Sequence, residues 1–181
     1  ENLVILPDDM DNLSVAFLEP ISVALHVIRN SGLNYGKNVA VFGLGAIGMF
    51  IAQWAKIFGA KHVFAIDIDS EKVDLAKKIG FKEAICIKDI NIEKYINNLT
   101  DGVDFVFEAS GSMEAFRQGI KILRQSGRLG LVGRPTKDII LKPEDFEKIL
   151  RSQLKIIGTW SFEMKNFPSN DWKERMEAIY T

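Results

Sequence analysis

Residues 38–48 constrain this chain most strongly, because β-branched and apolar residues there lead directly into three closely spaced glycines. An apolar helical pattern follows at once, so the glycines lie where a predicted strand passes into a predicted helix. Gly43 permits a tight turn, Gly45 lets the backbone approach a diphosphate, and Gly48 lets the helix pack closely on the sheet. The free N–H groups and the positive dipole end of such a helix favour phosphate. The segment therefore predicts dinucleotide binding.

Asp67 closes the next apolar run, 24 positions after Gly43. A carboxylate there can accept hydrogen bonds from both hydroxyls of an adenosine ribose. It also repels a 2′-phosphate, by roughly 1 kcal/mol in water and by several times more at a lower effective dielectric. Ile68 stands where an NADP-binding protein often carries Arg, so NAD is favoured, although Lys72 weakens the repulsion. The alternative is that Asp67 is only a turn residue at the end of a strand.

Strands and helices are predicted to alternate along the chain, which indicates an α/β Rossmann fold with a doubly wound, parallel, six-stranded sheet and helices on both faces. The carboxyl ends of the strands would then bring together Gly43, Asp67, and residues 108–111 and 132–134. The predicted strands are residues 39–42, 62–66, 84–87, 103–108, 128–132 and 154–159, and the helices between them are residues 46–58, 70–79, 90–99, 113–123 and 143–151.

The chain is expected to form a single NAD-binding domain over residues 1–181. Residues 1–32 would form a linker strand and a helix capped by Asp8 or Asp11, which kinks or restarts at Pro20 because proline lacks an N–H group. Residues 33–160 would form the Rossmann core, and residues 161–181 a helix cut short at the last residue. Both ends predict a fragment of a larger polypeptide.

Composition excludes several classes of protein. The 181 residues carry a net charge of −1 with dispersed Lys and Arg, which argues against a nucleic-acid partner. No signal peptide or membrane-spanning apolar run is visible, so we expect no membrane partner and a cytoplasmic location. Cys86 is the one cysteine, which rules out an internal disulfide, and its apolar surroundings predict an inert core thiol.

Four segments together resemble the zinc-containing medium-chain dehydrogenases, and within them the polyol branch of sorbitol dehydrogenase and galactitol-1-phosphate 5-dehydrogenase. These segments are Glu19-Pro-Ile-Ser-Val-Ala-Leu-His26, the glycine motif, Ala65-Ile-Asp-Ile-Asp-Ser-Glu-Lys72, and residues 148–160. The resemblance spans nearly the whole chain but only the cofactor-binding half of such an enzyme. It implies that the catalytic domain, with its Cys and His-Glu zinc ligands, is absent, and that this half alone is inactive.

The resemblance implies hydride transfer between a polyol carbon and the nicotinamide of NAD, with zinc as a Lewis acid. Glu19 matches a position that supplies a zinc ligand or a partner to zinc-bound water. A solvated helix acid is the alternative. Ile47 and Val23 would contact the nicotinamide. The implied cofactor-binding residues are Val23, Gly43, Gly45, Ala46, Ile47, Gly48, Asp67, Lys72, Ala109, Gly111, Val132 and Gly133.

Other readings remain open. A stand-alone NAD-sensing module without catalysis is the main alternative, and a methyltransferase is disfavoured because no acid directly precedes Gly43. Arg134 or Lys165 would provide a positive charge for a phosphorylated polyol. The simpler alternative is a solvated loop cation. His26 and His62 are predicted to be structural. In the family that the chain resembles, the edge corresponding to residues 154–159 pairs with a second subunit, which implies a homodimer or homotetramer.

Overall fold

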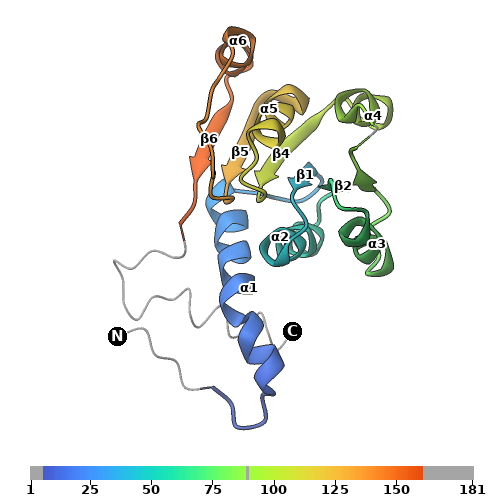
Figure 1. The fold of residues 1–181 in the computed structure, drawn as a ribbon, viewed down its shortest axis with the longest axis vertical. Helices are drawn as coiled ribbons and strands as arrows, with labels where there is room; N and C mark the ends of the chain where they lie inside the picture. The colour runs from blue at the N-terminus through green and yellow to red at the C-terminus, as the bar shows by residue number, and fades with distance from the viewer. Residues whose placement is uncertain (1–5, 89, 161–181) are drawn as a thin grey trace.

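The computed structural model describes residues 6–88 and 90–160. Its strands form one parallel sheet, with β1 and β4 at the centre and β3 and β6 at the edges (Figure 1). The order β3-β2-β1-β4-β5-β6 confirms the predicted doubly wound Rossmann fold. The strands are β1 (Asn38–Phe42), β2 (His62–Asp67), β3 (Ala84–Cys86), β4 (Val103–Glu108), β5 (Leu123–Leu131) and β6 (Lys155–Gly158).

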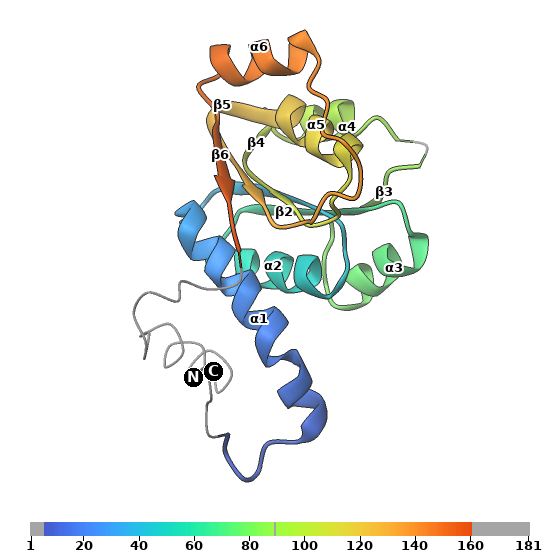
Figure 2. The ribbon, with the colours of Figure 1, turned by 60° about the vertical axis from the view of Figure 1, so that its left-hand side comes forward.

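The helices cover both faces of this sheet, with α1, α2 and α3 on one side and α4, α5 and α6 on the other (Figure 1). The N-terminal half of α1 extends past the rest of the domain (Figure 2). The helices are α1 (Asn12–Ser31), α2 (Ala46–Ile57), α3 (Ser70–Lys78), α4 (Ile92–Leu99), α5 (Met113–Ile122) and α6 (Pro143–Arg151).

The central strands are buried on both faces, as a parallel sheet between two helical layers requires. All five residues of β1 are buried. Val39 and Val41 belong to the core beneath α1 and α2, whereas Ala40 and Phe42 belong to the core beneath α4 and α5. Because both sets of alternating residues are buried, the central strands appear in the sequence as continuous apolar runs. The parallel arrangement also leaves the polar residues that follow each strand at one edge of the sheet.

Pro20 does not interrupt α1, so the expected restart is wrong. One helix runs through it, capped at its start by the Asp11 carboxylate, which accepts hydrogen bonds from the N–H groups of Leu13 and Ser14. The Ser14 hydroxyl and these N–H groups hold the pKa of Asp11 below its usual value. Beyond Pro20 the helix is buried from Ser22 to Leu25. Packing of this second half against the sheet stabilises the helix despite the hydrogen bond that proline removes.

β5 begins at Leu123, five residues earlier than the predicted strand, because α5 passes into it without a loop. The register is irregular at this point. Val103 pairs with Leu123 and Phe105 with Arg128, so β5 carries extra residues between the two pairs. Ser126 has a φ of 59° in this stretch. A positive φ in a serine gives no recognisable signal in a sequence, which is why the early start was not predicted.

A buried ion pair attaches α6 to α5. Asp145 is 1% exposed, and its Oδ2 lies 2.5 Å from Nε of Arg117. Burial alone would raise the pKa of Asp145. The hydrogen bonds from Arg117 and from the Lys142 N–H, together with the charges of Arg117 and Lys121, nevertheless hold that pKa below its usual value. The pair therefore stabilises the fold at neutral pH.

Replacement of Asp145 by Asn is expected to lower the free energy of unfolding at pH 7 by about 2–3 kcal/mol, because it leaves the Arg117 charge uncompensated. Since the folded pKa of Asp145 is lowered, its contribution is complete above the unfolded pKa, near about 4, and is lost as the pH falls through the folded pKa. The difference in the free energy of unfolding between the variant and the wild type should therefore be smaller in acid. Urea unfolding at pH 7 and pH 3 measures it. Asp74→Asn, which breaks an exposed pair with Lys77, should change little.

Candidate cofactor-binding site

The turn between β1 and α2 is built from glycines in distinct environments. Gly43 has a φ of 90°, and a Cβ atom there would lie 2.8 Å from the Ser110 nitrogen. A Cβ atom on Gly48 would lie 1.8 Å from the Gly43 carbonyl oxygen. By contrast, a Cβ atom on Gly45 would meet nothing within 4 Å. The fold itself therefore requires Gly43 and Gly48, whereas Gly45 leaves an open surface that internal packing does not explain.

This open surface coincides with the start of α2. Gly45 is the N-cap residue, no side chain caps the helix, and both Gly45 and Ala46 are exposed. The first N–H groups of a helix lack intrahelical partners, and the helix dipole adds positive charge at the same place. An anionic group of a ligand can bind here without displacing any protein atom. The arrangement fits the diphosphate of a dinucleotide.

Asp67 lies at the carboxyl end of β2, beside the glycine turn, and is 8% exposed. Its Oδ2 accepts a hydrogen bond of 2.6 Å from the Leu44 N–H, and its Oδ1 accepts one of 2.9 Å from the Asp69 N–H. Lys72 Nζ lies 3.9 Å from Oδ2 of both aspartates. The carboxylate therefore holds the glycine turn in place. Each of its oxygens keeps a lone pair for a further donor, as a ribose contact requires.

The ends of β4 and β5 supply the next part of the site. The Ala109 N–H donates to the Phe42 carbonyl, which places residue 109 beside the glycine turn. The Glu108 carbonyl accepts hydrogen bonds from the N–H groups of Val132 and Gly133. Four of the predicted cofactor contacts therefore lie together at adjacent strand ends, namely Ala109, Gly111, Val132 and Gly133.

Glu108 was predicted to lie at the ligand edge of the sheet, but no role of its own was predicted for it. It is 3% exposed, and its carboxylate accepts hydrogen bonds from the N–H groups of Ser110 and Gly111 and from the Ser110 hydroxyl. The signal in the sequence is an acid that ends an apolar run and is followed within three residues by serine and glycine. A short turn with free N–H groups is what such an acid can bind.

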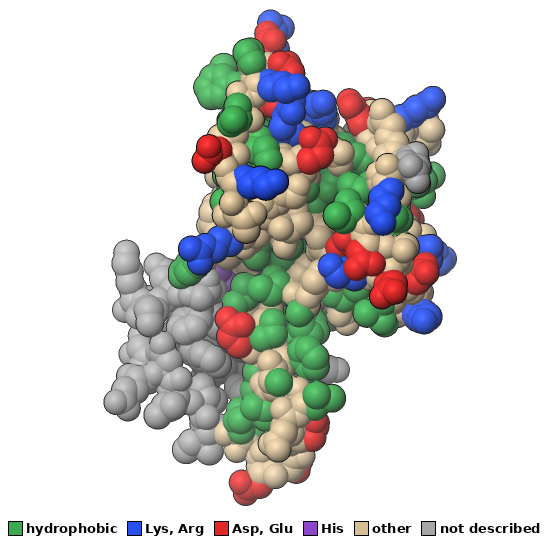
Figure 3. All heavy atoms as spheres, viewed as in Figure 1, with side chains coloured by type: hydrophobic (Ala, Val, Ile, Leu, Met, Phe, Trp, Pro, Cys, Tyr) green, Lys and Arg blue, Asp and Glu red, His purple; other side chains and the backbone are tan. Residues whose placement is uncertain are grey.

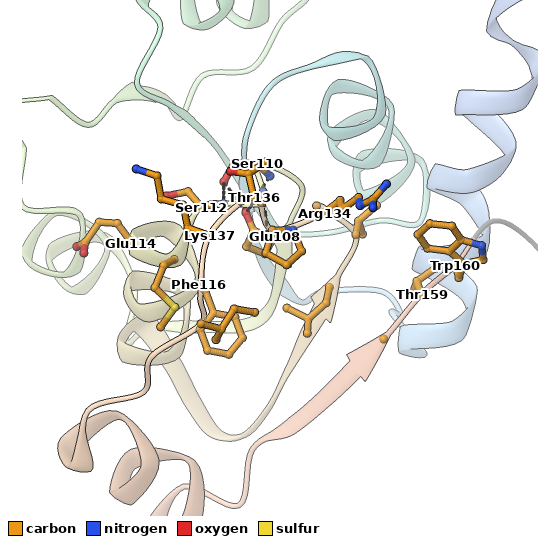
Figure 4. A pocket seen from close by; sticks show the side chains of 18 residues that line it. Glu108, Ser110, Ser112, Glu114, Phe116, Arg134, Thr136, Lys137, Thr159 and Trp160 are labelled. Carbon is orange, nitrogen blue, oxygen red and sulfur yellow. Dashed lines mark hydrogen bonds between the residues drawn. The ribbon is translucent and has the colours of Figure 1, made fainter.

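A cavity of about 660 Å³ opens above the ends of β4, β5 and β6 (Figure 4). Gly111, Val132 and Gly133 line it, whereas the glycine turn after β1 does not. Arg134 also lines the cavity and is exposed. In Figure 4 its side chain extends away from α5, toward the side on which Trp160 lies. Lys165, the other predicted cation, lies outside the described residues.

α1 and the start of α2 carry the remaining predicted contacts. Val23 is 7% exposed and Glu19 is exposed one turn earlier on the same helix. Ile47, at the start of α2, packs partly against the same core as α1. The Trp54 indole N–H donates to the Ile21 carbonyl at 3.3 Å and joins the two helices. The two predicted nicotinamide contacts therefore come from helices that pack against each other.

The described residues hold no group of three His, Cys, Asp or Glu side chains that would bind a metal ion. Glu19 alone cannot hold zinc, which takes four ligands in proteins, of which three come from the protein at catalytic sites. His62 lies at the start of β2, with Nδ1 3.2 Å from Glu83 Oε1, far along the strand from the site. His26 lies on α1 and is half-buried.

Cys86 packs against the core, as predicted for a core thiol, but it is covered less than expected. It is half-buried, it pairs in register with Asp67 at the carboxyl end of β3, and its thiol lies 3.5 Å from the Ile68 carbonyl oxygen. β3 is a short edge strand of three residues, so its last side chain is only partly covered. The sequence pattern does not reveal this, because an apolar run looks alike at the centre and at the edge of a sheet.

Comparison with known proteins agrees with this geometry. Residues 46–180 match the family model described as zinc-binding dehydrogenase, and the chain belongs to this family. It is 33% identical to galactitol 1-phosphate 5-dehydrogenase of Escherichia coli K12 over 96% of the chain and 51% of that protein. It is 34% identical to sorbitol dehydrogenase of Halalkalibacterium halodurans over 89% of the chain and 47% of that protein.

The crystal structure of galactitol-1-phosphate dehydrogenase from Escherichia coli superposes with a TM-score of 0.85 at 32% identity, covering 97% of this chain and 51% of that one. The chain therefore spans about half the length of the relatives it matches, and the matching half is the cofactor-binding one. Between residues 6 and 160, no helix has both the length and the apolar character needed to cross a bilayer.

Proposed function

We propose that this chain is the NAD-binding half of a zinc-dependent polyol dehydrogenase, which moves a hydride from a secondary alcohol to NAD. The observation that carries the proposal is the uncapped start of α2 at Gly45 and Ala46, open to solvent beside the buried carboxylate of Asp67. One feature suits a diphosphate and the other a ribose. The likeness to polyol dehydrogenases over nearly the whole chain supports the choice of substrate.

Asp67 supports NAD rather than NADP as the cofactor. Its carboxylate is buried, hydrogen-bonded and fixed in position, so a 2′-phosphate would meet a negative charge that cannot turn away. Lys72 offsets part of this repulsion, but it is shared between Asp67 and Asp69 at equal distances of 3.9 Å. The net charge of these three groups is negative. Lys72 would therefore serve the ribose hydroxyls rather than a phosphate.

Each predicted contact has a role in this proposal. The N–H groups at Gly45, Ala46, Ile47 and Gly48 would bind the diphosphate, and Ile47 and Val23 would bound the nicotinamide. Ala109, Gly111, Val132 and Gly133 would line the groove between these ends. The nicotinamide supplies the hydride acceptor, and the chain's own part is to bind and orient it. Glu19 would contribute one oxygen to zinc, whose other ligands would come from outside the described residues.

Calorimetric titration of the purified chain tests the cofactor. We expect NADH to bind, NADPH to bind at least about tenfold more weakly, and S-adenosylmethionine not to bind. Gly45→Val should abolish NADH binding because its side chain would occupy the open surface, and Gly158→Ala, at another uncrowded glycine, should not. A folded chain that ignores millimolar NADH would refute the proposal. Binding without turnover in the longer polypeptide would favour the NAD-sensing module instead.

Arg134 offers a test of whether the substrate is phosphorylated. Its exposed guanidinium has no ion pair within the described part of the chain, and it lies at the cofactor end of β5. In the enzyme that contains both halves, Arg134→Ala is expected to raise KM for a polyol phosphate about tenfold while changing KM for the free polyol little, since a phosphate contact carries charge. Steady-state kinetics with galactitol 1-phosphate and sorbitol measure this. Equal losses for both substrates would reject the phosphate role.

β6 supports the proposal of a homodimer. It is an edge strand with one neighbour in the sheet, and Ile156 on it is 41% exposed. Further exposed apolar residues lie before it, namely Ile139, Ile140, Phe146 and Leu150. In Figure 3 apolar side chains lie along one side of α6, at the top of the molecule, with charged side chains beside them. An uncovered apolar edge of this kind favours pairing with a second chain.

Ile156→Lys is expected to raise the dimer dissociation constant at least about tenfold, because a lysine on the edge strand would be desolvated twice at a symmetric interface. Sedimentation equilibrium measures the dissociation constant. Ile57→Lys makes the same change at a 69% exposed residue on α2 and should leave the association unchanged. A wild-type chain that stays monomeric at high micromolar concentration would contradict the proposed dimer.

A further inference from the structure

Glu108, the last residue of β4, is a buried acid whose charge is met by hydrogen-bond donors rather than by a cation. It is 3% exposed, and no Lys, Arg or His forms an ion pair with it among the described residues. Oε1 accepts hydrogen bonds of 2.8 Å from the Ser110 N–H, 2.5 Å from the Ser110 hydroxyl and 2.9 Å from the Gly111 N–H. Oε2 lies 3.2 Å from the Gly111 nitrogen.

The main chain of Glu108 is hydrogen-bonded to the turn after β5. Its carbonyl oxygen accepts hydrogen bonds of 2.9 Å from the Val132 N–H and 2.8 Å from the Gly133 N–H. The side chain therefore holds the turn after β4, and the carbonyl holds the turn after β5. One residue thus fixes the relative position of two turns that meet at the proposed cofactor groove.

These turns are packed so closely that a shift in one must move the other. A Cβ atom on Gly133 would lie 2.2 Å from the Gly111 nitrogen, and one on Gly111 would lie 2.2 Å from the Arg134 carbonyl oxygen. The turn after β4 also touches the glycine turn, because a Cβ atom on Gly43 would lie 2.8 Å from the Ser110 nitrogen. The backbones of these turns therefore approach each other so closely that there is no room for a side chain between them, and a displacement of one turn is transmitted to the next.

We propose that Glu108 is a positioning residue for the dinucleotide. Its hydrogen bonds fix where the turns after β4 and β5 lie relative to the glycine turn. The inference rests on the proposed function. No contact between Glu108 and the cofactor is part of this proposal. Glu108 acts through Ala109, Gly111, Val132 and Gly133, each of which either adjoins it in sequence or is bonded to it. A carboxylate suits this role because its two oxygens accept several hydrogen bonds in fixed directions.

Asp104 provides a matched control on the same strand. It lies near the amino end of β4, and its Oδ2 accepts a hydrogen bond of 2.8 Å from the Asn38 N–H. Both acids therefore hold a backbone N–H group with a carboxylate on β4, but Asp104 does so at the opposite end of the sheet. If Glu108 only stabilised the fold, neither Glu108→Gln nor Asp104→Asn would change the Kd for NADH of the folded chain.

Two measurements test the proposal on the 181-residue chain. In Glu108→Gln the amide oxygen can take the place of Oε1, but the carboxylate charge is lost and the NH₂ group would face the Gly111 N–H from the Oε2 position. We expect amide hydrogen exchange at Ser110, Gly111, Val132 and Gly133 to accelerate at least about tenfold without any ligand, and Kd for NADH to rise by a similar factor. Asp104→Asn should accelerate exchange at Asn38 and leave Kd unchanged. Ser110→Ala, which removes one donor and keeps the carboxylate, should raise Kd by about threefold.

Unchanged exchange at the two turns in Glu108→Gln would overturn the proposal, whether or not NADH binds. Faster exchange with unchanged Kd, or an equal rise of Kd in Asp104→Asn, would also overturn it. If Glu108→Gln does not fold, an unchanged Kd for NADH in Ser110→Ala would overturn the proposal. Failure of the wild-type chain to bind NADH would refute the proposed function instead, and the exchange data without ligand would still decide the role of Glu108.

Discussion

Gly48→Ala is expected to lower the free energy of unfolding by about 2–4 kcal/mol. The added Cβ atom would lie 1.8 Å from the Gly43 carbonyl oxygen and 2.9 Å from its carbonyl carbon, both of which belong to the backbone and cannot rotate away. α2 would have to move off the glycine turn. The gain in helix propensity from Gly to Ala, about 1 kcal/mol, offsets only part of this cost. Urea unfolding followed by circular dichroism measures the change.

Gly45→Ala is the control for this substitution, because it adds the same methyl group three residues earlier. The backbone at Gly45, with φ of −67° and ψ of −175°, suits alanine, and no atom lies within 4 Å of the new Cβ. Stability should change by less than about 1 kcal/mol, while NADH affinity falls. A Gly48→Ala variant as stable as the wild type would contradict the close packing between α2 and the glycine turn.

Asp67→Asn is expected to weaken NADH binding about tenfold and to shift the ratio of NADPH to NADH affinity about tenfold toward NADPH. The change removes the charge that opposes a 2′-phosphate, while Asn keeps one oxygen to accept a hydrogen bond from the Leu44 or Asp69 N–H. Lys72 would then face a single carboxylate, which makes its charge more available to a phosphate. Fluorescence titration with both reduced cofactors measures the ratio.

Asp69→Asn is the matched control. Asp69 lies two residues from Asp67, its carboxylate is also 3.9 Å from Lys72, and it is 43% exposed. Asn serves as well as Asp at an N-cap, so α3 should be unaffected. The control therefore removes a charge near the same lysine without touching the predicted ribose contact. If the two variants shift the ratio equally, the effect comes from the charge freed on Lys72 rather than from the position of the Asp67 carboxylate.

Much of the fold was predictable because local signals and tertiary packing agree. The predicted helices 46–58 and 70–79 end within one residue of α2 and α3, and Gly59 and Gly80, which follow the two C-cap residues, have φ values of 79° and 97°. The central strands were visible as apolar runs because the sheet is covered on both faces there. The parallel order followed from the alternation of strands with helices, since each crossover needs a helix.

The environment of three residues was predicted less well from the sequence, and the reason is the same for each. These residues are Pro20, Cys86 and Glu108. Pro20 lies within a helix whose second half is buried, Cys86 ends an edge strand, and Glu108 bonds to turns on two different strands. In each case the deciding contact comes from a segment distant in the sequence or from the absence of a neighbouring strand. Propensity and periodicity describe a residue's own segment, so they carry no information about such contacts.

Residue types at short and regular spacings were enough to predict the element order, the glycine turn, the acid at the end of β2 and the family. Which glycines the fold requires, and which one leaves a surface open, became visible only in the folded chain, because that depends on atoms from other strands. The folded chain also shows that the Asp67 carboxylate holds the glycine turn, and that Glu108 joins the turns after β4 and β5. Hydrogen bonds act over about 3 Å of space whatever the separation along the chain.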